Sequence, residues 1–187
     1  MPEGHTIHRA ARLQSKRFVG TELSVSSPHG RFEDGSALLD GHHIDYIDAL
    51  GKNLFNRWDH GHVLHVQLGL FGKFRIHAED PPPPTDGTRL QMVSEQGTLY
   101  LSGPTDCSVI DPEEEDRIVS DLGPDPLRRK THATAVEHMT RDLGRRTVPI
   151  GAALLDQSVI CGIGNVYRAE MLFRLGINPH VESRRVD

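Results

Sequence analysis

The sequence has no long hydrophobic run, few aromatic residues and little cysteine. Among 187 residues, 5% are aromatic and only Cys107 and Cys161 are cysteines. No stretch approaches the roughly 20 apolar residues of a transmembrane helix, and the N-terminus lacks the apolar run of a signal peptide. Two thiols without a CxxC pair exclude a zinc module of the cysteine type in this chain and favour free thiols over a disulfide. We therefore expect a cytoplasmic protein without a membrane partner.

The charge is unevenly distributed along the chain. The formal net charge is -5, and residues 111–116 (DPEEED) carry five acids in six positions. Because a whole-chain sum hides such blocks, local basic surface is still compatible with phosphate binding. The basic residues form two groups, which are Arg9, Arg12, Lys16 and Arg17, and then Arg128, Arg129, Lys130, Arg141, Arg145 and Arg146.

The first two thirds of the sequence predict one helix followed by antiparallel strands. Residues 3–17 have helical periodicity and end before Gly20, and residues 79–87 (EDPPPPTDG) can only be an exposed loop. Alternating runs separated by turn residues are typical of hairpins in a sandwich or barrel. The predicted strands lie at 23–27, 42–50, 52–59, 62–69 and 73–78, with a hairpin at 91–103 that turns at Gln96-Gly97. The predicted turns are Pro28 with Gly30, Asp34-Gly35, Asp40-Gly41 and 59–61.

The pattern becomes helical after residues 122–127 (LGPDPL), which contain two prolines and a glycine and read as a linker. Helices are predicted at 133–143, 149–156 and 165–176, the last of which stops at Gly176. We therefore predict a β-rich domain at 1–121, a linker at 122–127 and a helical domain at 128–187.

The N-terminus carries a reactive group once Met1 is removed, as aminopeptidases do when a small residue such as proline follows. Pro2 then has a free secondary amine, which can attack an aldehyde carbon and form a Schiff base. The pKa of an α-amine is near ~7.8, against ~10.4 for lysine, so far more of it is neutral at pH 7. Glu3 could act beside it as a general acid. A helix start with a first-turn carboxylate explains the same residues, and both interpretations stay open here.

Two predicted hairpin turns carry residues suited to nucleic acid. Lys52, in GKNLF, could contact a phosphate or assist protonation, although a lysine at a hairpin tip is usually just solvated. Leu70 and Phe71 lie between two glycines in QLGLFGKFR. An exposed apolar pair can enter a base stack where a nucleotide is extruded. The alternative is that both side chains fold back onto the core.

A glycine-rich turn precedes the last predicted helix, in QSVICGIGNVYRAE. Gly162 and Gly164 would form the turn, and Asn165 is expected to cap the helix. Backbone N–H groups at such a turn can hold a phosphate. Plain capping and close packing of the glycines fit the same pattern.

One stretch is rich in histidine. It contains His60, His62 and His65, with His42 and His43 upstream. No carboxylate has a convincing spacing, and strands of period two would divide these side chains between two faces. We therefore expect no metal site, and a metal-dependent hydrolase is the remotest functional class.

Taken together, the motifs resemble one family. In order, the chain contains MPEGHTIHRAARL, GKNL, QLGLFG, LGPDPL and QSVICGIGNVYRAEMLFRLGINP. Over essentially the whole chain this resembles the formamidopyrimidine-DNA glycosylase/endonuclease VIII family of base-excision repair enzymes. The PEG start is similar to the endonuclease VIII branch, in an actinobacterial form. The resemblance implies an α+β fold, with a β-sandwich flanked by helices, then a helix–two-turns–helix domain, and DNA in the cleft between them.

The resemblance also implies residue roles. Pro2 matches the nucleophile that displaces the damaged base at C1′, and Glu3 matches the general acid/base. Lys52 matches a lysine that contacts DNA beside the lesion, and Leu70 with Phe71 matches the loop that fills the void of the flipped nucleotide.

Two positions in the last helix complete the implied set. Asn165 matches an asparagine that holds a lesion-flanking phosphate, and Glu170 falls at an acidic position of the same helix.

Two departures from the family pattern stand out. Thr6 occupies a position that is acidic in many members, and the chain stops at SRRVD, before the zinc finger or its zincless equivalent. We therefore expect a C-terminally truncated member with no cofactor in this chain.

The implied function is a bifunctional DNA glycosylase/AP lyase that removes oxidised bases through a Pro2 Schiff base, followed by β- and δ-elimination. The implied partner is damaged double-stranded DNA, with single-stranded DNA left open, for a monomeric bacterial protein at the nucleoid. The alternatives are a non-catalytic damaged-DNA-binding module and a fragment that is inactive without its finger.

Overall fold

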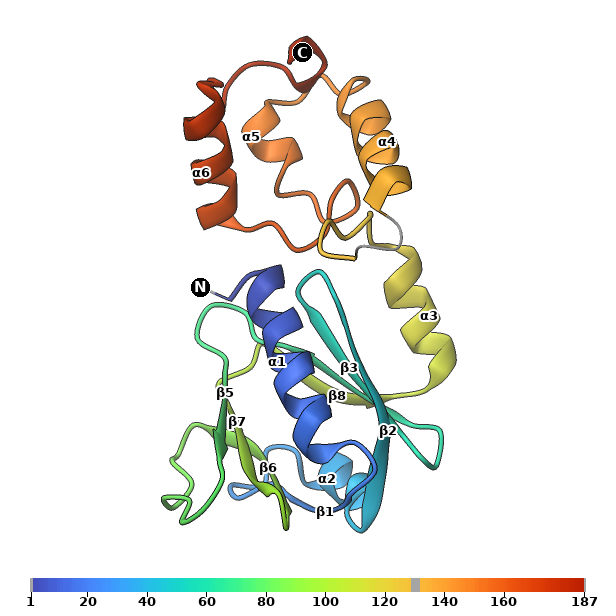
Figure 1. Ribbon diagram of the computed structural model, residues 1–187, viewed down its shortest axis with the longest axis vertical. Coiled ribbons are helices and arrows are strands. Elements are labelled where there is room, and N and C mark those ends of the chain that lie inside the picture. The colour runs from blue at the N-terminus through green and yellow to red at the C-terminus, as the bar shows by residue number, and fades with distance from the viewer. Residues whose placement is uncertain (1, 129–131, 187) are drawn as a thin grey trace.

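The computed structural model describes residues 2–128 and 132–186, and it has a β-rich part and a helical part stacked end to end (Figure 1). Helices α1, α2 and α3 belong to the β-rich part, and the remaining helices form the other part. Their bounds are α1 (Gly4–Phe18), α2 (Glu33–Leu39), α3 (Pro112–Ser120), α4 (His132–Leu143), α5 (Ile150–Ala153), α6 (Asn165–Leu175) and the 3-10 turn η2 (Ser183–Arg185).

The strands form one antiparallel sheet of two halves. Its order is β5-β7-β6-β1-β2-β3-β4-β8, and β1 pairs with β2 only at Glu22–His43 and Leu23–His42. This short link lets the halves fold toward each other, as in a sandwich. The strands are β1 (Glu22–Ser26), β2 (His42–Leu50), β3 (Asn53–Trp58), β4 (Val63–Gln67), β5 (Lys73–His77), β6 (Thr88–Ser94), β7 (Gly97–Ser102) and β8 (Asp106–Ile110).

The main core fills the space between the two halves and α1. Helix α1 buries the side chains of Ile7, Ala11 and Phe18, which recur at helical spacing on one face. Leu23, Leu90 and Leu99 come from one half of the sheet. Ile44, Leu54, Trp58 and Leu64 come from the other half. The predicted α+β class, with a sandwich followed by helices, is confirmed.

The structure corrects several local predictions. Asp34-Gly35, predicted as a turn, lies inside α2, where Gly35 leaves room for the ring of Phe32. The acidic block was not predicted to be helical, yet it forms α3 with Pro112 in the first turn and Asp111 accepting from the Glu114 N–H. Strand β8 was not predicted either. The helix predicted at 149–156 is shorter, covering only Ile150–Ala153.

Other predictions are confirmed. Every predicted strand run forms a strand, residues 79–87 are a loop, and α6 ends at Gly176 in the left-handed conformation. Both cysteines are free thiols. Within the described ranges, no helix is long and apolar enough to cross a membrane. The domain bounds at 1–121, 122–127 and 128–187 stay a prediction.

Candidate active site

Glu3 joins the N-terminus to the helical part. It is only 1% exposed, although it is charged and precedes α1 directly. Its carboxylate accepts the backbone N–H groups of Gly164 (3.0 Å), Val166 (2.8 Å) and Tyr167 (3.2 Å). These are the free N–H groups of the α6 N-terminus, where the helix dipole also favours an anion. Glu3 is therefore the cap of α6, supplied from far away in the sequence.

Three glycines allow the two parts to approach this closely. The Gly4 N–H donates to the Gly162 carbonyl at 2.8 Å. A Cβ on Gly51 would lie 2.7 Å from Cys161 Cβ and 2.9 Å from the Gly162 nitrogen. Gly51 and Gly162 also have positive φ, of 58° and 96°. The segments that contain Gly4, Gly51 and Gly162 therefore meet at one point. Any larger residue at Gly51 would push the β-rich and helical parts apart.

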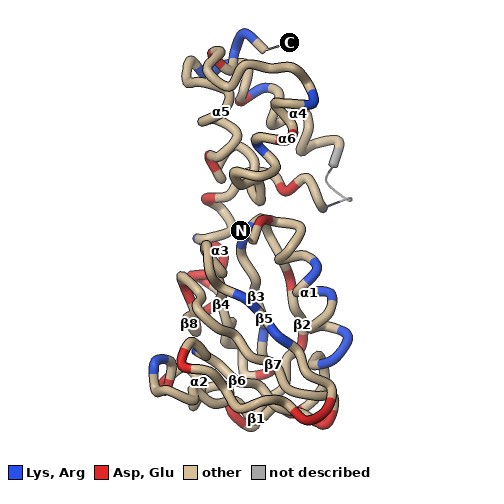
Figure 2. Tube along the Cα trace, turned by 90° about the vertical axis from the view of Figure 1, so that its left-hand side faces the viewer, with Lys and Arg blue, Asp and Glu red and all other residues tan. Residues whose placement is uncertain are grey.

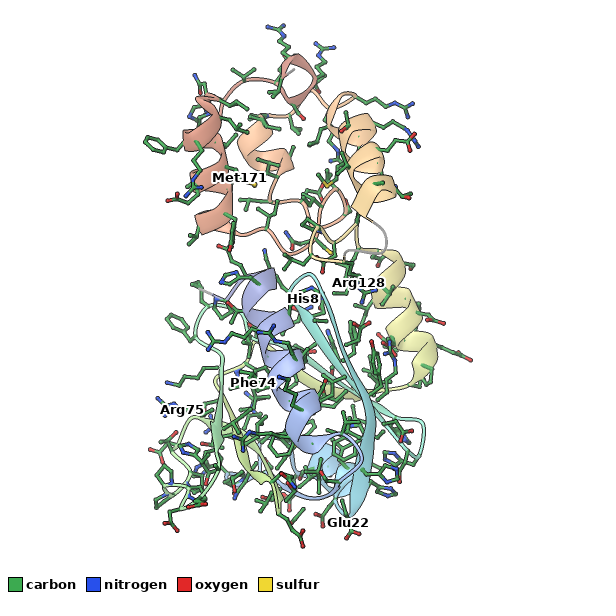
Figure 3. All side chains as sticks on the ribbon, in the orientation of Figure 1. His8, Glu22, Phe74, Arg75, Arg128 and Met171 are labelled. Carbon is green, nitrogen blue, oxygen red and sulfur yellow. The ribbon has the colours of Figure 1, made fainter. Side chains whose placement is uncertain are left out.

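Asp125 of the connecting segment fastens the same junction. It is 2% exposed and accepts His8 Nε2 and the Gly51 N–H at 2.7 Å each, and the Leu127 N–H at 2.8 Å. Burial by itself would raise the pKa of Asp125, but the hydrogen bonds from His8, Gly51 and Leu127 outweigh it and lower the pKa. Figure 3 shows His8 on α1 at this junction. Asp125 thus fixes α1 and the turn before Lys52 together.

Lys52 and Pro2 line one cleft. It has a volume of about 490 Å³, and Leu70, Phe71 and Gly164 also line it. Partial burial lowers the pKa of Lys52, while the negative charge of Glu3 opposes that shift. The cleft therefore places Pro2 near a lysine that gives up its proton more readily than an exposed one.

The β4–β5 loop borders this cleft with two exposed apolar side chains. Leu70 is 58% exposed and Phe71 is 85% exposed, so they do not fold back onto the core. Gly72 is required here, because a Cβ would lie 2.2 Å from the Leu68 carbonyl oxygen. The loop is therefore held at its base while its apolar tip faces solvent.

Two predicted site residues lie on α6, outside this cleft. Asn165 is exposed and is the first residue of α6. The N-cap position is occupied by Gly164, which has no side chain to cap the helix. The prediction that Asn165 caps α6 is therefore wrong. Glu3 also takes three of the amides considered for phosphate. Glu170 is exposed and forms an ion pair with Arg174 at 3.8 Å.

Family models match both parts of the chain. The formamidopyrimidine-DNA glycosylase N-terminal domain matches residues 1–107, and the H2TH domain of formamidopyrimidine-DNA glycosylase matches residues 122–187. The chain belongs to the formamidopyrimidine-DNA glycosylase/endonuclease VIII family.

Curated relatives and solved structures agree with this family. The chain is 46% identical over 191 residues to Endonuclease 8 1 of Mycobacterium tuberculosis, covering 100% of this chain and 70% of the relative. It is 32% identical to a formamidopyrimidine-DNA glycosylase of Acidiphilium cryptum, covering 96% of this chain and 66% of the relative.

Two solved structures of the family have the same fold. MutM (Fpg) of Thermus thermophilus superposes with a TM-score of 0.81 at 30% identity, covering 100% of this chain and 69% of that chain. Lactococcus lactis Fpg, in a complex with DNA containing N7-benzyl-Fapy-dG, gives 0.82 at 25% identity and covers 100% and 72%.

In this family member, basic side chains follow one side of the cleft. Arg9, Arg12 and Lys16 are exposed on α1, and Lys73 and Arg75 are exposed on β5. A groove of about 580 Å³ between the two elements is lined by Pro2, Arg9 and Lys73, among others. Figure 2 shows this basic side, with the acidic α3 on the other side of the view. Sequence reasoning missed the β5 residues, because only the pairing of strands places them opposite α1.

The second basic group predicted from the sequence is largely engaged in ion pairs. Arg128 bonds Asp48 at 2.6 Å, Arg146 bonds Asp156 at 2.9 Å, and Arg141 lies 3.6 Å from Glu137. Arg129 and Lys130 lie outside the described residues. The basic side of α1 and β5 is therefore the better candidate for phosphate contacts.

The described residues do not fit a zinc finger of this family. Cys107 packs against the main core, whereas Cys161 belongs to a separate apolar cluster with Leu50 and Phe55. Burial raises the pKa of each thiol to about 12, which disfavours the thiolate that zinc requires.

The histidines behave differently from the prediction. His65 is buried and bonds Asn53 and Asp106, apart from the others. His42 and His60, however, meet at Asp59, a carboxylate that the spacing did not reveal.

Proposed function

We propose that the chain is a DNA glycosylase and AP lyase that acts on damaged DNA. The observation that carries this proposal is one cleft lined by Pro2, Lys52 and the Leu70–Phe71 tip, with Glu3 fixed directly behind Pro2. An amine nucleophile, an acid and a proton-transfer partner are the groups that Schiff-base chemistry at a sugar carbon needs. Family membership supports the same activity.

In the proposed reaction, the neutral Pro2 nitrogen attacks C1′ of the damaged nucleotide. The C1′–N bond breaks and its electron pair leaves with the base. The Glu3 carboxylate takes the proton of the Pro2 nitrogen and delivers it to the ring oxygen, so that the sugar opens and an iminium forms between Pro2 and C1′, while the expelled base takes a proton from water. Loss of a C2′ proton then expels the 3′ phosphate by β-elimination, and δ-elimination expels the 5′ phosphate. Lys52, whose pKa is lowered, would move a proton or contact a phosphate.

The exposed tip and the basic side support DNA as the proposed partner. Leu70 and Phe71 would enter the base stack at the place that the extruded nucleotide leaves. Extrusion is needed because Pro2 cannot reach the C1′ atom of a nucleotide that stays stacked in the duplex. Arg9, Arg12 and Lys73 would neutralise phosphates along the same side. Asn165 and Glu170 remain proposed contacts near the phosphate that flanks the lesion. We propose a monomer that works on double-stranded DNA at the nucleoid.

Borohydride trapping tests the lyase chemistry. Intact mass first establishes that Met1 is removed, and the protein is then incubated with abasic-site DNA and sodium borohydride. Reduction of the iminium should link the chain to DNA, with peptide mapping placing the link at Pro2. A Pro2→Leu variant, which keeps Met1, is the matched control and should give no link.

The outcomes separate the two candidate functions. A processed chain that gives no adduct at any protein concentration overturns the lyase proposal. Specific binding to abasic DNA without an adduct would instead identify a damaged-DNA-binding module.

A further inference from the structure

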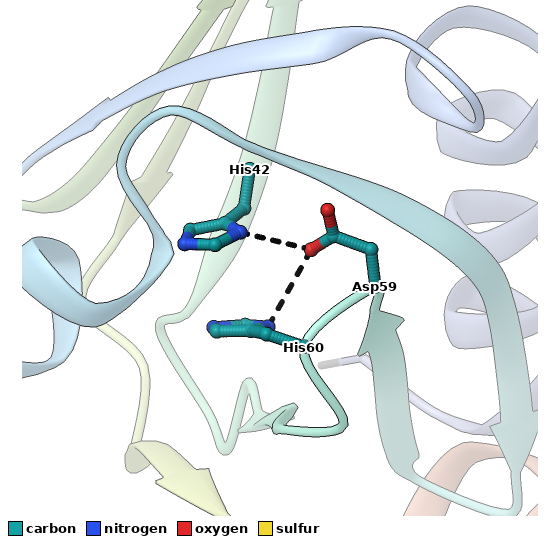
Figure 4. A group of neighbouring side chains, drawn as sticks. All are labelled: His42, Asp59 and His60. Atoms are coloured by element: carbon teal, nitrogen blue, oxygen red, sulfur yellow. Dashed lines mark hydrogen bonds and ion pairs between the residues drawn. The ribbon is translucent and has the colours of Figure 1, made fainter.

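A cluster of histidines surrounds Asp59 at the end of the β2–β3 hairpin opposite Lys52 (Figure 4). His42 opens β2, Asp59 follows β3, and His60 lies in the next turn. Asp59 Oδ1 lies 3.0 Å from His42 Nδ1 and 3.6 Å from His60 Nδ1. The backbone holds these positions, because the Asp59 N–H donates to the His43 carbonyl at 3.1 Å.

The tautomer of His60 leaves one electron pair without a partner. His60 Nε2 lies 2.8 Å from the Leu38 carbonyl oxygen, which can only accept, so Nε2 carries the proton. In a neutral ring, Nδ1 then bears a lone pair facing an anionic oxygen. This Nδ1 has no hydrogen-bond partner and is hidden from solvent. Two electron-rich atoms in this arrangement need a cation between them, either a proton or a metal ion.

The distances from Asp59 Oδ1 to the two ring nitrogens fit a transition metal. With metal–ligand distances of about 2.0–2.2 Å, tetrahedral geometry separates two ligand atoms by about 3.3 Å. The distances of 3.0 and 3.6 Å from Asp59 Oδ1 bracket this value. Two imidazole nitrogens with one carboxylate oxygen form a set that Zn²⁺ accepts. We propose that His42, Asp59 and His60 bind Zn²⁺.

The surroundings support such a site. A metal-bound histidine usually donates its second ring N–H to a carbonyl, as His60 does to Leu38. His43 Nδ1 lies 3.0 Å from the other oxygen of Asp59 and orients the carboxylate. The rings of His42 and His60 are stacked at 4.1 Å and 17°, which is repulsive if both are charged.

Metal binding requires a small rearrangement. Because the two rings are nearly parallel, one of them turns about its Cβ–Cγ bond so that both lone pairs converge. The His42, Asp59 and His60 side chains are 39%, 29% and 21% exposed, so solvent can supply the fourth ligand. The site is therefore open and exchangeable, unlike a closed structural zinc site. It is independent of the proposed DNA chemistry.

Zinc titration of the tag-free chain tests the site. Isothermal titration calorimetry with ZnCl₂ should show a single zinc ion per chain, and Co²⁺ should give the visible absorption of a low-symmetry site. Asp59→Asn, which can still accept the His42 proton, and His60→Gln should each weaken binding by more than about tenfold. His62→Gln is the matched control and should bind like the unchanged chain, because His62 touches His60 but offers no ligand atom to Asp59.

Either of two results overturns the proposal. One is zinc binding that is absent, or equal in the unchanged chain and in Asp59→Asn. The other is an NMR titration in which His60 Nδ1 binds a proton and saturating Zn²⁺ leaves the His42 and His60 signals unmoved. Circular dichroism of both variants separates a lost ligand from a lost fold.

Discussion

The start of α1 and the tip of the β4–β5 loop line the same cleft, yet they are built in opposite ways. Glu3 is 1% exposed and is fixed by three backbone donors, whereas Phe71 is 85% exposed. Groups that must be aimed at a bond are thus held by the folded chain itself. Side chains that would enter a base stack are left without partners until DNA supplies them. Substituting the rigid residue should therefore lower the free energy of unfolding, whereas substituting the exposed residue should mainly weaken DNA binding.

The largest expected effect separates the structural and chemical roles of Glu3. Glu3→Gln keeps a carbonyl oxygen for the α6 amides but loses the acid, so base excision should fall by about 10²–10⁴-fold. Glu3→Ala also removes the cap and should cost about 3 kcal/mol or more in the free energy of unfolding. Single-turnover kinetics and urea denaturation measure the two quantities. A Gln variant with full activity would contradict the proposed role of Glu3.

The next effect tests the glycine contact at the junction. Gly51→Ala combines a positive φ with a Cβ 2.7 Å from Cys161 Cβ, and we expect it to destabilise the chain by about 2–4 kcal/mol. Gly20→Ala is the matched control, because Gly20 has φ of 75° but nothing within 4 Å. It should cost only about 1–2 kcal/mol. Equal losses in thermal denaturation would show that the close approach is unimportant.

A smaller effect concerns Asp125, and it depends on pH. Because the folded-state pKa of Asp125 is lowered, its stabilisation is present above the unfolded pKa of about 3.9 and is lost as pH falls through the folded pKa. Asp125→Asn should therefore cost about 1–3 kcal/mol at pH 7 and much less in acid. Asp116→Asn, at an exposed position on α3, is the control and should change little. A loss that does not shrink below about pH 4 argues against the ionised carboxylate.

The smallest effect on stability is expected at the exposed tip. Phe71→Ala should leave the free energy of unfolding within about 0.5 kcal/mol. It should weaken binding to damaged duplex by about tenfold, since stacking on a base contributes about 1–3 kcal/mol. Phe173→Ala is matched in exposure, also at 85%, but lies on α6 away from the cleft and should bind DNA normally. Equal losses in both variants, measured by fluorescence anisotropy, would remove the tip from the DNA interface.

Local patterns predicted the elements well where period and turn residues agreed. The alternation in residues 62–69 and the stop at Gly176 are two examples. The local patterns failed at Asp34-Gly35, where packing against Phe32 outweighs the turn preference. They also failed at 111–116, where a run of acidic residues is the start of a capped helix that was not predicted. The cap of α6 could not be predicted locally, because its acceptor is 161 positions away from Gly164.

The sequence by itself determined most of the strand and helix pattern, the expectation of free thiols and the order of motifs that resembles the family. Only the tertiary structure decided which motifs meet. Glu3 finds the α6 amides and Gly51 packs on Cys161 across large sequence separations, while the pairing of β2 with β3 brings His42 to Asp59 and His60. The physical reason is that periodicity reports which face of an element is buried. Hydrogen bonds and close glycine contacts depend instead on where separate elements come to lie.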